Sequence, residues 1–127
     1  MPIIGHGVDI VEIARIAAML QDHGERFLDR CFTLAERDYA ESAPKQREQR
    51  YAVRFAAKEA ALKALGTGWR NGISWRDIGV VNEPSGRPVL NITGRCADLA
   101  SQMSISSWQV SLSHTGSMAI ASVIAYG

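Results

Sequence analysis

The residues of this chain best suited to chemistry are a carboxylate and an ammonium one helical turn apart. Glu59 and Lys63 lie in the stretch RFAAKEAALKALGTG, which runs from Arg54 to Gly68. At 3.6 residues per turn the two side chains share one face, and small or apolar residues fill most of the others. Such a pair is either an ordinary helix-stabilising ion pair, contributing about 0.2–0.5 kcal/mol, or part of a site. The spacing alone leaves both interpretations open.

The charge around this pair favours a site. The segment from Pro44 to Leu65 contains six cations and two acids, whereas the whole chain has a net charge of only +1. A local concentration of positive charge is typical of surfaces that bind phosphate groups. The cations are Lys45, Arg47, Arg50, Arg54, Lys58 and Lys63. The segment is therefore a candidate phosphate-binding surface.

A third candidate for chemistry is Asp9, which stands between Val8 and Ile10. The run from Ile3 to Val11 mixes β-branched residues with glycine and predicts a strand. An acid in an apolar strand is either a cap for the helix that follows or a ligand that the fold tolerates at some cost. The sequence does not decide between these two roles.

A histidine is expected at the tip of the last hairpin. His114 lies between Ser113 and Thr115, whose hydroxyl groups can bind an anion together with the imidazole. A lone hairpin histidine usually faces solvent without a role, and spacing alone does not favour the anion site.

Basic and apolar side chains recur in the first helical region. They are Arg15, Met19, Arg26, Phe27 and Arg30. Exposed arginines are usually only solvated, and the residues by themselves favour that interpretation. The alternative is a surface that receives an acidic partner helix.

The elements that must position these residues follow from periodicity and turn signals. Apolar spacing predicts a helix from Ile13 that closes at Gly24, and a short helical segment follows. Thr33-Leu34-Ala35-Glu36 matches a capping box and predicts a helix from Leu34 to Glu41. Pro44 suits the first turn of the long basic helix, which ends at the glycines before a loop over residues 66–74.

In the second half of the chain the spacing of apolar residues changes from the helical period of 3.6 to the strand period of 2. This predicts strands over Trp75–Asn82, Pro88–Ile92, Trp108–Ser113 and Met118–Ala125, with a short helix from Arg95 to Met103. One strand, then helices, then mainly antiparallel strands is the order of an α+β domain.

Length and composition exclude several classes of protein. A chain of 127 residues fits one domain, so residues 1–127 are expected to form a single unit. The apolar runs are too short to span a membrane, and the N-terminus does not match a signal peptide. Cys31 and Cys96 lack the spacing of a zinc site or a disulfide framework. With the near-neutral charge, nucleic-acid binding is weakly supported. A cytoplasmic protein is the simplest interpretation.

Three segments identify a protein family far more specifically together than each does alone. They are GVDIVEIARI (Gly7–Ile16), RFAAKEAALKALGTG (Arg54–Gly68) and SLSHTGSMAIASVI (Ser111–Ile124). The GTG loop by itself is weak evidence, and without a following GK[ST] it is not a Walker A loop. Together the segments resemble the holo-acyl-carrier-protein synthases, the small trimeric class of 4′-phosphopantetheinyl transferases. The resemblance extends from Ile3 to Ala125 and includes the NEPSGRP turn.

The resemblance implies an architecture and a reaction. The expected fold is that of the 4′-phosphopantetheinyl transferases, with a mainly antiparallel sheet packed on a long central helix. The expected assembly is a homotrimer with active sites between subunits, Asp9 and Glu59 on one chain and the His114 hairpin on another. The implied reaction moves 4′-phosphopantetheine from coenzyme A to a serine of apo acyl carrier protein, in fatty acid biosynthesis, and releases 3′,5′-ADP.

The family pattern also implies roles in catalysis. Asp9 and Glu59 match the residues that bind Mg²⁺, an ion that prefers carboxylate, water and phosphate oxygens. Lys63 is expected to contact the coenzyme A diphosphate. Glu59 is the candidate base for the serine hydroxyl, acting directly or through a metal-bound water.

Binding roles follow from the same resemblance. Arg54, His114 and Thr115 match binders of the coenzyme A 3′-phosphate, joined by Lys45, and Gly66 and the NEPSGRP turn are expected to approach the nucleotide through the backbone. The surface offered to the acidic helix of the carrier protein is implied to comprise Arg15, Met19, Arg26 and Arg30.

The chain departs from the family in one place, and two alternatives stay open. Asp77-Ile78 is followed by Gly79, where family members commonly carry an acid. One alternative is a non-catalytic trimeric module that binds coenzyme A or a nucleotide. Asp9, Glu59 and Lys63 argue against this module. A protein that only binds coenzyme A gains little from two carboxylates beside the negative diphosphate, unless a metal ion bridges them. The other is a transferase that serves a specialised polyketide or peptide carrier protein.

Overall fold

The computed structural model describes residues 1–70 and 72–127 of the chain. Its elements are, in order, β1 (Ile3–Glu12), α1 (Ile13–Cys31), α2 (Leu34–Glu41), η1 (Pro44–Gln46), α3 (Arg47–Leu65), η2 (Trp75–Asp77), β2 (Ile78–Asn82), β3 (Pro88–Ile92), α4 (Gly94–Gln102), β4 (Ser107–His114) and β5 (Met118–Tyr126). The predicted α+β class is confirmed. Within the described residues, no helix has the length and apolar character that a membrane span requires.

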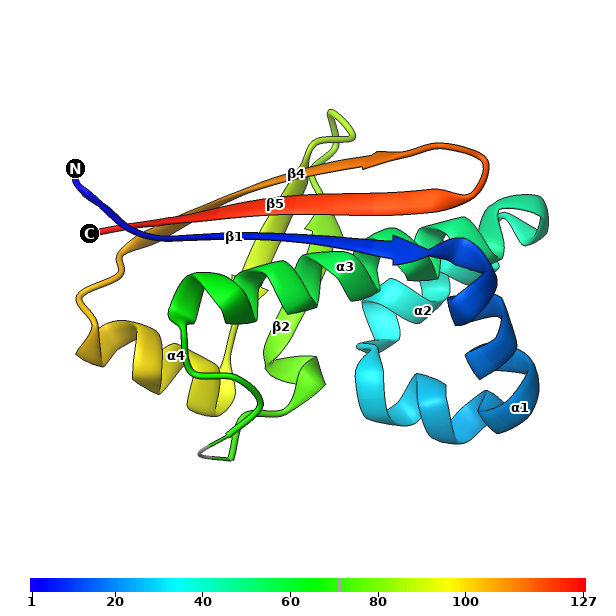
Figure 1. Cartoon of the computed structure of the whole chain (residues 1–127), viewed down its shortest axis with the longest axis horizontal. Helices are drawn as coiled ribbons and strands as arrows, with labels where there is room; N and C mark the ends of the chain where they lie inside the picture. The colour runs from blue at the N-terminus through cyan, green and yellow to red at the C-terminus, as the bar shows by residue number, and fades with distance from the viewer. Residues whose placement is uncertain (71) are drawn as a thin grey trace.

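The larger sheet has three antiparallel strands in the order β1-β5-β4, and β2 and β3 form a separate hairpin. Figure 1 shows the three strands running along α3. The alternating side chains of β5 give the sheet a buried face of small residues on this helix, Ala119, Ala121, Val123 and Ala125. The opposite face of the sheet exposes apolar residues of β1 and β5, chiefly Val8, Ile10 and Ile120.

Two glycines let β1 lie directly against α3. A Cβ atom on Gly5 would come within 2.0 Å of the carbonyl oxygen of Ala64, and one on Gly7 within 1.9 Å of that of Ala60. Real side-chain carbons do not approach a backbone oxygen so closely, so only glycine permits this contact. Asp9 follows on the same face of the strand, because strand residues two apart share a face. The glycine contact therefore brings Asp9 to the helix.

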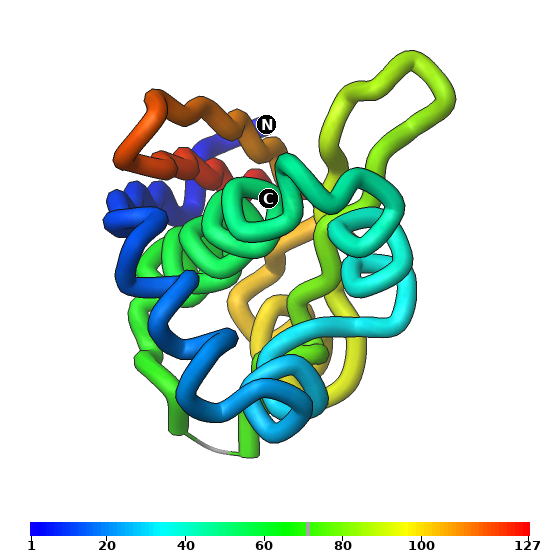
Figure 2. Tube along the Cα trace, turned by 90° about the vertical axis from the view of Figure 1, so that its right-hand side faces the viewer, coloured from blue at the N-terminus to red at the C-terminus, as the bar shows by residue number. Residues whose placement is uncertain are grey.

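The central helix α3 is buried on almost every side, as its nearly all-round apolar sequence predicts. It packs against the large sheet, α1, α2 and β2, and Figure 2 shows its turns surrounded by these elements. Gly66 ends it in the left-handed conformation with φ 78°, which confirms the predicted helix end. A helix enclosed in this way holds its backbone in a fixed position relative to the large sheet, α1, α2 and β2.

Several predicted boundaries need correction. The strand expected from Trp75 begins at Ile78, because Ser74 and Asp77 form a capping box that coils residues 75–77 into η2. Gly24, with φ 47°, interrupts α1 with a kink at the predicted position, and the helical segment expected after it continues to Cys31. His114 is the last residue of β4, one position before the hairpin tip. The loop expected over residues 66–74 includes Asn71, which lies outside the described residues.

Candidate active site

Asp9, Glu59 and Lys63 gather where β1 runs along the second half of α3. Lys63 Nζ donates to Asp9 Oδ1 at 3.2 Å and to the carbonyl oxygen of Val8 at 3.0 Å. The N-cap of α1 is Glu12, and it makes no side-chain capping bond. Asp9 is therefore not a helix cap. Among the described ion pairs Lys63 joins Asp9 rather than Glu59, so the ordinary pairing within the helix is not formed.

Glu59 is a half-buried carboxylate whose surroundings raise its pKa. Burial is the main cause, since a charged carboxylate loses hydration there, and the negative charge of Asp9 adds to it. The indole N–H of Trp69 lies 3.4 Å from Glu59 Oε1 and acts in the opposite direction, as does the charge of Lys63. A carboxylate of raised pKa binds a proton more readily, which suits a general base.

The two carboxylates fit a small divalent cation. Mg²⁺ is usually held by one or two carboxylates, with water and substrate phosphate oxygens completing its shell. No cluster of three or more His, Cys, Asp or Glu side chains suited to a metal occurs in residues 1–70 and 72–127. Asp9 already faces a positive group, the Lys63 ammonium. The donor set therefore matches an ion that binds together with a phosphate ligand rather than one enclosed by protein.

Glu59 borders two cavities. One, of about 390 Å³, is lined by Glu59, Leu62, Lys63, Gly66, Gly68 and Trp69. The other, of about 460 Å³, is lined by Glu59, Phe55, Trp75 and residues of α1 that include Arg15, Met19, Arg26 and Arg30. The structure thus brings all four residues of the predicted carrier surface to a single groove, the α1 groove, which Glu59 also lines.

The kink in α1 explains how its two halves line one groove. Gly24 has φ 47° and ψ −121°, a conformation that side chains other than glycine rarely adopt. The chain turns there, so that Arg15 and Met19 before the kink and Arg26 and Arg30 after it contribute to the same cavity. Arg15 also lies over the ring of Phe55 on α3, with its guanidinium carbon 5.7 Å from the ring centre.

A second cationic cluster lies at the first half of α3. Arg54 and His114 line a cavity of about 330 Å³. Arg54 is only 3% exposed, and its Nε atom has no hydrogen-bond partner. Its terminal nitrogens donate to the Arg50 carbonyl and to Asn82 Oδ1, each at 3.3 Å. Burial lowers the pKa of Arg54, so an anion in this cavity would relieve an incompletely compensated charge.

The other predicted coenzyme A residues divide between these places. Lys45 and Thr115 line an adjoining cavity of about 290 Å³, and His114 Nε2 lies 2.8 Å from Gln49 Nε2. Lys63 and Gly66 belong to the Glu59 end. Since a helix rises 1.5 Å per residue, Arg54 and Lys63 are separated by about 14 Å along α3. Within one chain the predicted coenzyme A residues therefore form two separate groups, one around Arg54 and His114 and one around Lys63.

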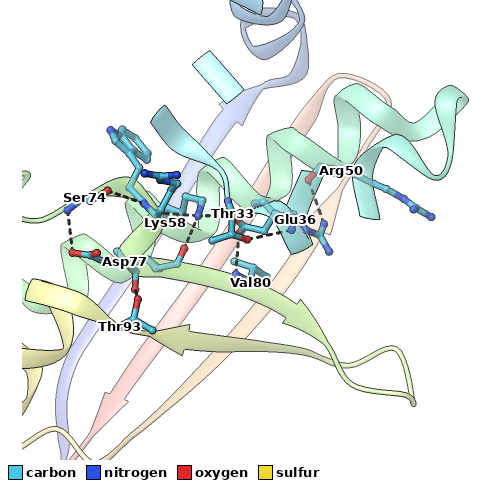
Figure 3. Close-up of polar contacts among 12 residues, drawn as sticks. Thr33, Glu36, Arg50, Lys58, Ser74, Asp77, Val80 and Thr93 are labelled. Atoms are coloured by element: carbon cyan, nitrogen blue, oxygen red, sulfur yellow. Dashed lines mark hydrogen bonds and ion pairs between the residues drawn. The ribbon is translucent and has the colours of Figure 1, made fainter. Parts of the chain in front are cut away.

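The sequence did not reveal the role of Lys58, which was counted among the phosphate-binding cations. Lys58 and Glu36 form an ion pair in which both side chains are 0% exposed. Lys58 also donates to the carbonyl oxygens of Trp75 and Ile78, and Glu36 accepts from the amides of Thr33 and Val80 (Figure 3). The ammonium is thus enclosed and unable to meet a phosphate. The only indication in the sequence is that Lys58 lies on a helix with small or apolar residues on most of its sides.

Comparison with known proteins gives a consistent result. A family model described as the 4′-phosphopantetheinyl transferase superfamily matches residues 5–123. The holo-[acyl-carrier-protein] synthase of Koribacter versatilis is 48% identical over 122 residues, covering 96% of this chain and 97% of that protein. The corresponding protein of Geobacter sp. is also 48% identical over 122 residues, with the same coverage of 96% and 97%.

Solved structures agree with the fold. The holo-[acyl-carrier-protein] synthase of Neisseria meningitidis matches with a TM-score of 0.90 at 33% identity, over 99% of this chain and 100% of that chain. The synthase of Helicobacter pylori, solved in complex with coenzyme A, matches with a TM-score of 0.83 at 30% identity, over 95% and 99% of the two chains. The fold expected from the sequence is confirmed.

Proposed function

This chain belongs to the 4′-phosphopantetheinyl transferase superfamily, and we propose that it transfers 4′-phosphopantetheine from coenzyme A to a serine of an apo acyl carrier protein. The observation that carries the proposal is the position of Glu59 at the border of two cavities. A basic and apolar groove lies on one side of it, and a lysine and a glycine loop lie on the other. A protein substrate and a diphosphate can therefore meet at one carboxylate.

The residues at this border have complementary roles in the transfer. The serine hydroxyl arrives through the α1 groove and gives its proton to Glu59, while its oxygen attacks the phosphorus next to the pantetheine. A bond from the serine oxygen to phosphorus forms, and the bond to the leaving 3′,5′-ADP breaks. Lys63, which lines the opposite cavity, binds the diphosphate and offsets the charge on the departing group.

We expect the reaction to need Mg²⁺ held by Asp9 and Glu59. Two carboxylates beside a phosphate-binding lysine are the donor set that the ion takes with a nucleotide ligand. When bound, it supplies positive charge that polarises the phosphoryl oxygens. The ion pair of Asp9 with Lys63 supports this role, because the Lys63 side chain is 55% exposed and can also be reached by a phosphate.

The 3′-phosphate of coenzyme A is assigned to the cavity of Arg54 and His114, with Lys45 and Thr115 beside it. The unpartnered Nε of Arg54 supports this assignment, since a phosphate oxygen would supply the missing acceptor.

A homotrimer would bring the two coenzyme A groups together across subunits. The exposed apolar face of β1 and β5 supports such an assembly, since Ile10 is 59% and Val8 49% exposed. The active site would then take Asp9, Glu59 and Lys63 from one chain and the His114 hairpin from its neighbour. The cytoplasmic location stays a prediction.

Intact-mass spectrometry of an apo acyl carrier protein, incubated with this protein, coenzyme A and Mg²⁺, tests the function. A phosphopantetheine mass increment on the carrier, absent when EDTA is added, would support both the transfer and the ion. Coenzyme A binding that survives EDTA and Asp9→Ala, with no increment on any carrier, would favour the non-catalytic binding module instead. Competition between fatty-acid carriers and polyketide or peptide carriers would identify the partner.

A further inference from the structure

An aromatic stack lies beside Glu59. The rings of Trp69 and Trp75 are stacked with centroids 3.9 Å apart, and Trp75 stacks in turn on Phe55 at 4.8 Å. Phe55 belongs to α3, one turn before Glu59. Stacked aromatic rings attract each other and restrict each other's rotation. The Trp69 ring is thereby fixed over the helix that carries Glu59.

The stack is anchored to the buried ion pair. The carbonyl oxygen of Trp75 accepts from Lys58 Nζ at 3.2 Å, and Lys58 is bound to Glu36 at 2.8 Å. The backbone of Trp75 is thus held from inside the core, while its ring holds Trp69 from outside. A continuous set of contacts runs from the core to the indole of Trp69.

The indole of Trp69 ends this set of contacts at the carboxylate. Its Nε1 donates to Glu59 Oε1 over 3.4 Å, a long hydrogen bond. An indole is only a donor and has a single N–H, so it can occupy one carboxylate oxygen and leave the other available. Both residues line the cavity that contains Lys63.

We propose that Trp69 is a positioning residue, whose indole N–H holds one oxygen of Glu59 so that the other faces the place where the metal ion and the substrate bind. The inference rests on the proposed function, because it assigns Trp69 a part in the transfer. Partners that orient a catalytic or ligating carboxylate typically contribute about 10–100-fold to activity or metal affinity. Trp69 acts through Glu59 and not on the reacting atoms.

The contact itself can be tested without any turnover. In protein labelled with ¹⁵N, the indole resonances of Trp69, Trp75 and Trp108 are assigned by replacing each tryptophan with phenylalanine. Glu59→Gln is expected to shift the Trp69 indole resonance and to leave that of Trp108, on β4, in place. An unchanged Trp69 resonance would overturn the proposal. Since this readout needs no carrier protein, it is independent of whether the proposed transfer is observed.

The consequence for catalysis is tested with Trp69→Phe, which keeps an aromatic ring in the stack and removes the donor. The expected result is a fall in kcat of about 10–100-fold, with the KM for coenzyme A changed less than about twofold. Trp108→Phe is the matched control and is expected to keep the wild-type kcat. Wild-type kcat in Trp69→Phe, with the mutant's far-ultraviolet circular dichroism and thermal unfolding midpoint unchanged, would overturn the positioning role.

Discussion

Lys58 and Glu36 form an ion pair from which water is excluded, with Nζ and Oε1 2.8 Å apart and both side chains fully buried. The pair joins α3 to α2, and the backbone groups of Ile78 and Val80 bring β2 into the same network. Burial lowers the pKa of Lys58, and the charge of Glu36 opposes that shift. The pair therefore fixes the helix that carries Glu59 relative to its neighbours.

Removing one partner of this pair should destabilise the protein strongly. Lys58→Met leaves the Glu36 carboxylate buried without its cation, and such changes cost about 3–5 kcal/mol. Chemical denaturation measures the loss. Arg37→Met is the control, because Arg37 pairs with the exposed acids Glu25 and Asp29 and should cost about 0–1 kcal/mol. Equal losses in the two variants would contradict the structural role of the buried pair.

Replacing the candidate base should abolish transfer and leave the fold intact. Glu59→Gln keeps the shape of the side chain but removes the charge and the proton acceptor. We expect the transfer rate to fall by about 10²–10⁴-fold, measured by carrier mass, with an unchanged thermal unfolding midpoint. Turnover close to wild type would remove Glu59 from its catalytic role.

Reversing a charge in the α1 groove should affect the carrier protein and not coenzyme A. Arg15→Glu is expected to raise the KM for the carrier, most strongly at low ionic strength, because exposed charges govern encounter. The affinity for coenzyme A, from calorimetry, should stay the same. Arg95→Glu makes the same change on α4, at the opposite end of the molecule from α1 (Figure 1), and is the control. A KM for carrier that is the same in both variants would argue against the groove.

The two thiols should resist alkylation in the folded protein. Burial raises the pKa of Cys31 to about 11 and that of Cys96 to about 12. Because the thiolate is the reactive form, alkylation at pH 8.5 should be on the order of 100-fold slower than in the unfolded chain. Iodoacetamide labelling followed by mass spectrometry, with and without guanidinium, measures both rates. Rapid labelling of native Cys31 would contradict its burial.

The same raised pKa values have a consequence for stability. The folded chain keeps thiol protons that the unfolded chain releases near the ordinary value of 9.0. The contribution to stability is complete below that pH and is lost as the pH rises through about 11 for Cys31 and about 12 for Cys96. Cys31→Ala and Cys96→Ala should each reduce this alkaline dependence.

A methyl group at Gly7 should separate β1 from α3. The added Cβ of Gly7→Ala would meet the carbonyl oxygen of Ala60 at 1.9 Å, so the strand must move. Overpacking of this kind costs about 1–3 kcal/mol, and transfer should weaken as well because Asp9 lies on the displaced face. Gly116→Ala is the control for stability, since a Cβ there meets nothing within 4 Å. An unfolding midpoint equal to that of the control would contradict the contact.

The sequence predicts the elements well because each depends on local signals. Strand alternation places β3 at the residues observed, and the capping box of Thr33 and Glu36 marks the start of α2. The predicted start of the strand at Trp75 was wrong because a second local signal is present there. Ser74 and Asp77 form a second capping box, which competes with the strand pattern and coils the backbone.

Contacts between distant segments could not be predicted from local patterns. The burial of Lys58 and its pairing with Glu36 could not be predicted, because the partner lies 22 residues away in the sequence. The contact of Trp69 with Glu59 depends likewise on the path of the loop after α3. The family motifs identified Asp9, Glu59 and Lys63, but the pairing of Lys63 with Asp9 needed the packing of β1 on α3.

The arrangement along α3 has a consequence for how such a chain can vary. Arg54, Lys58 and Glu59 face three different surroundings from one helix, and each residue turns by about 100° from the last. A substitution leaves the directions of these three side chains around the helix unchanged. Inserting or deleting one residue between Arg54 and Glu59 turns Arg54 relative to Glu59 by about 100°, so that one of them loses its surroundings. The length of α3 between these residues is therefore constrained more strictly than the identity of the residues between them.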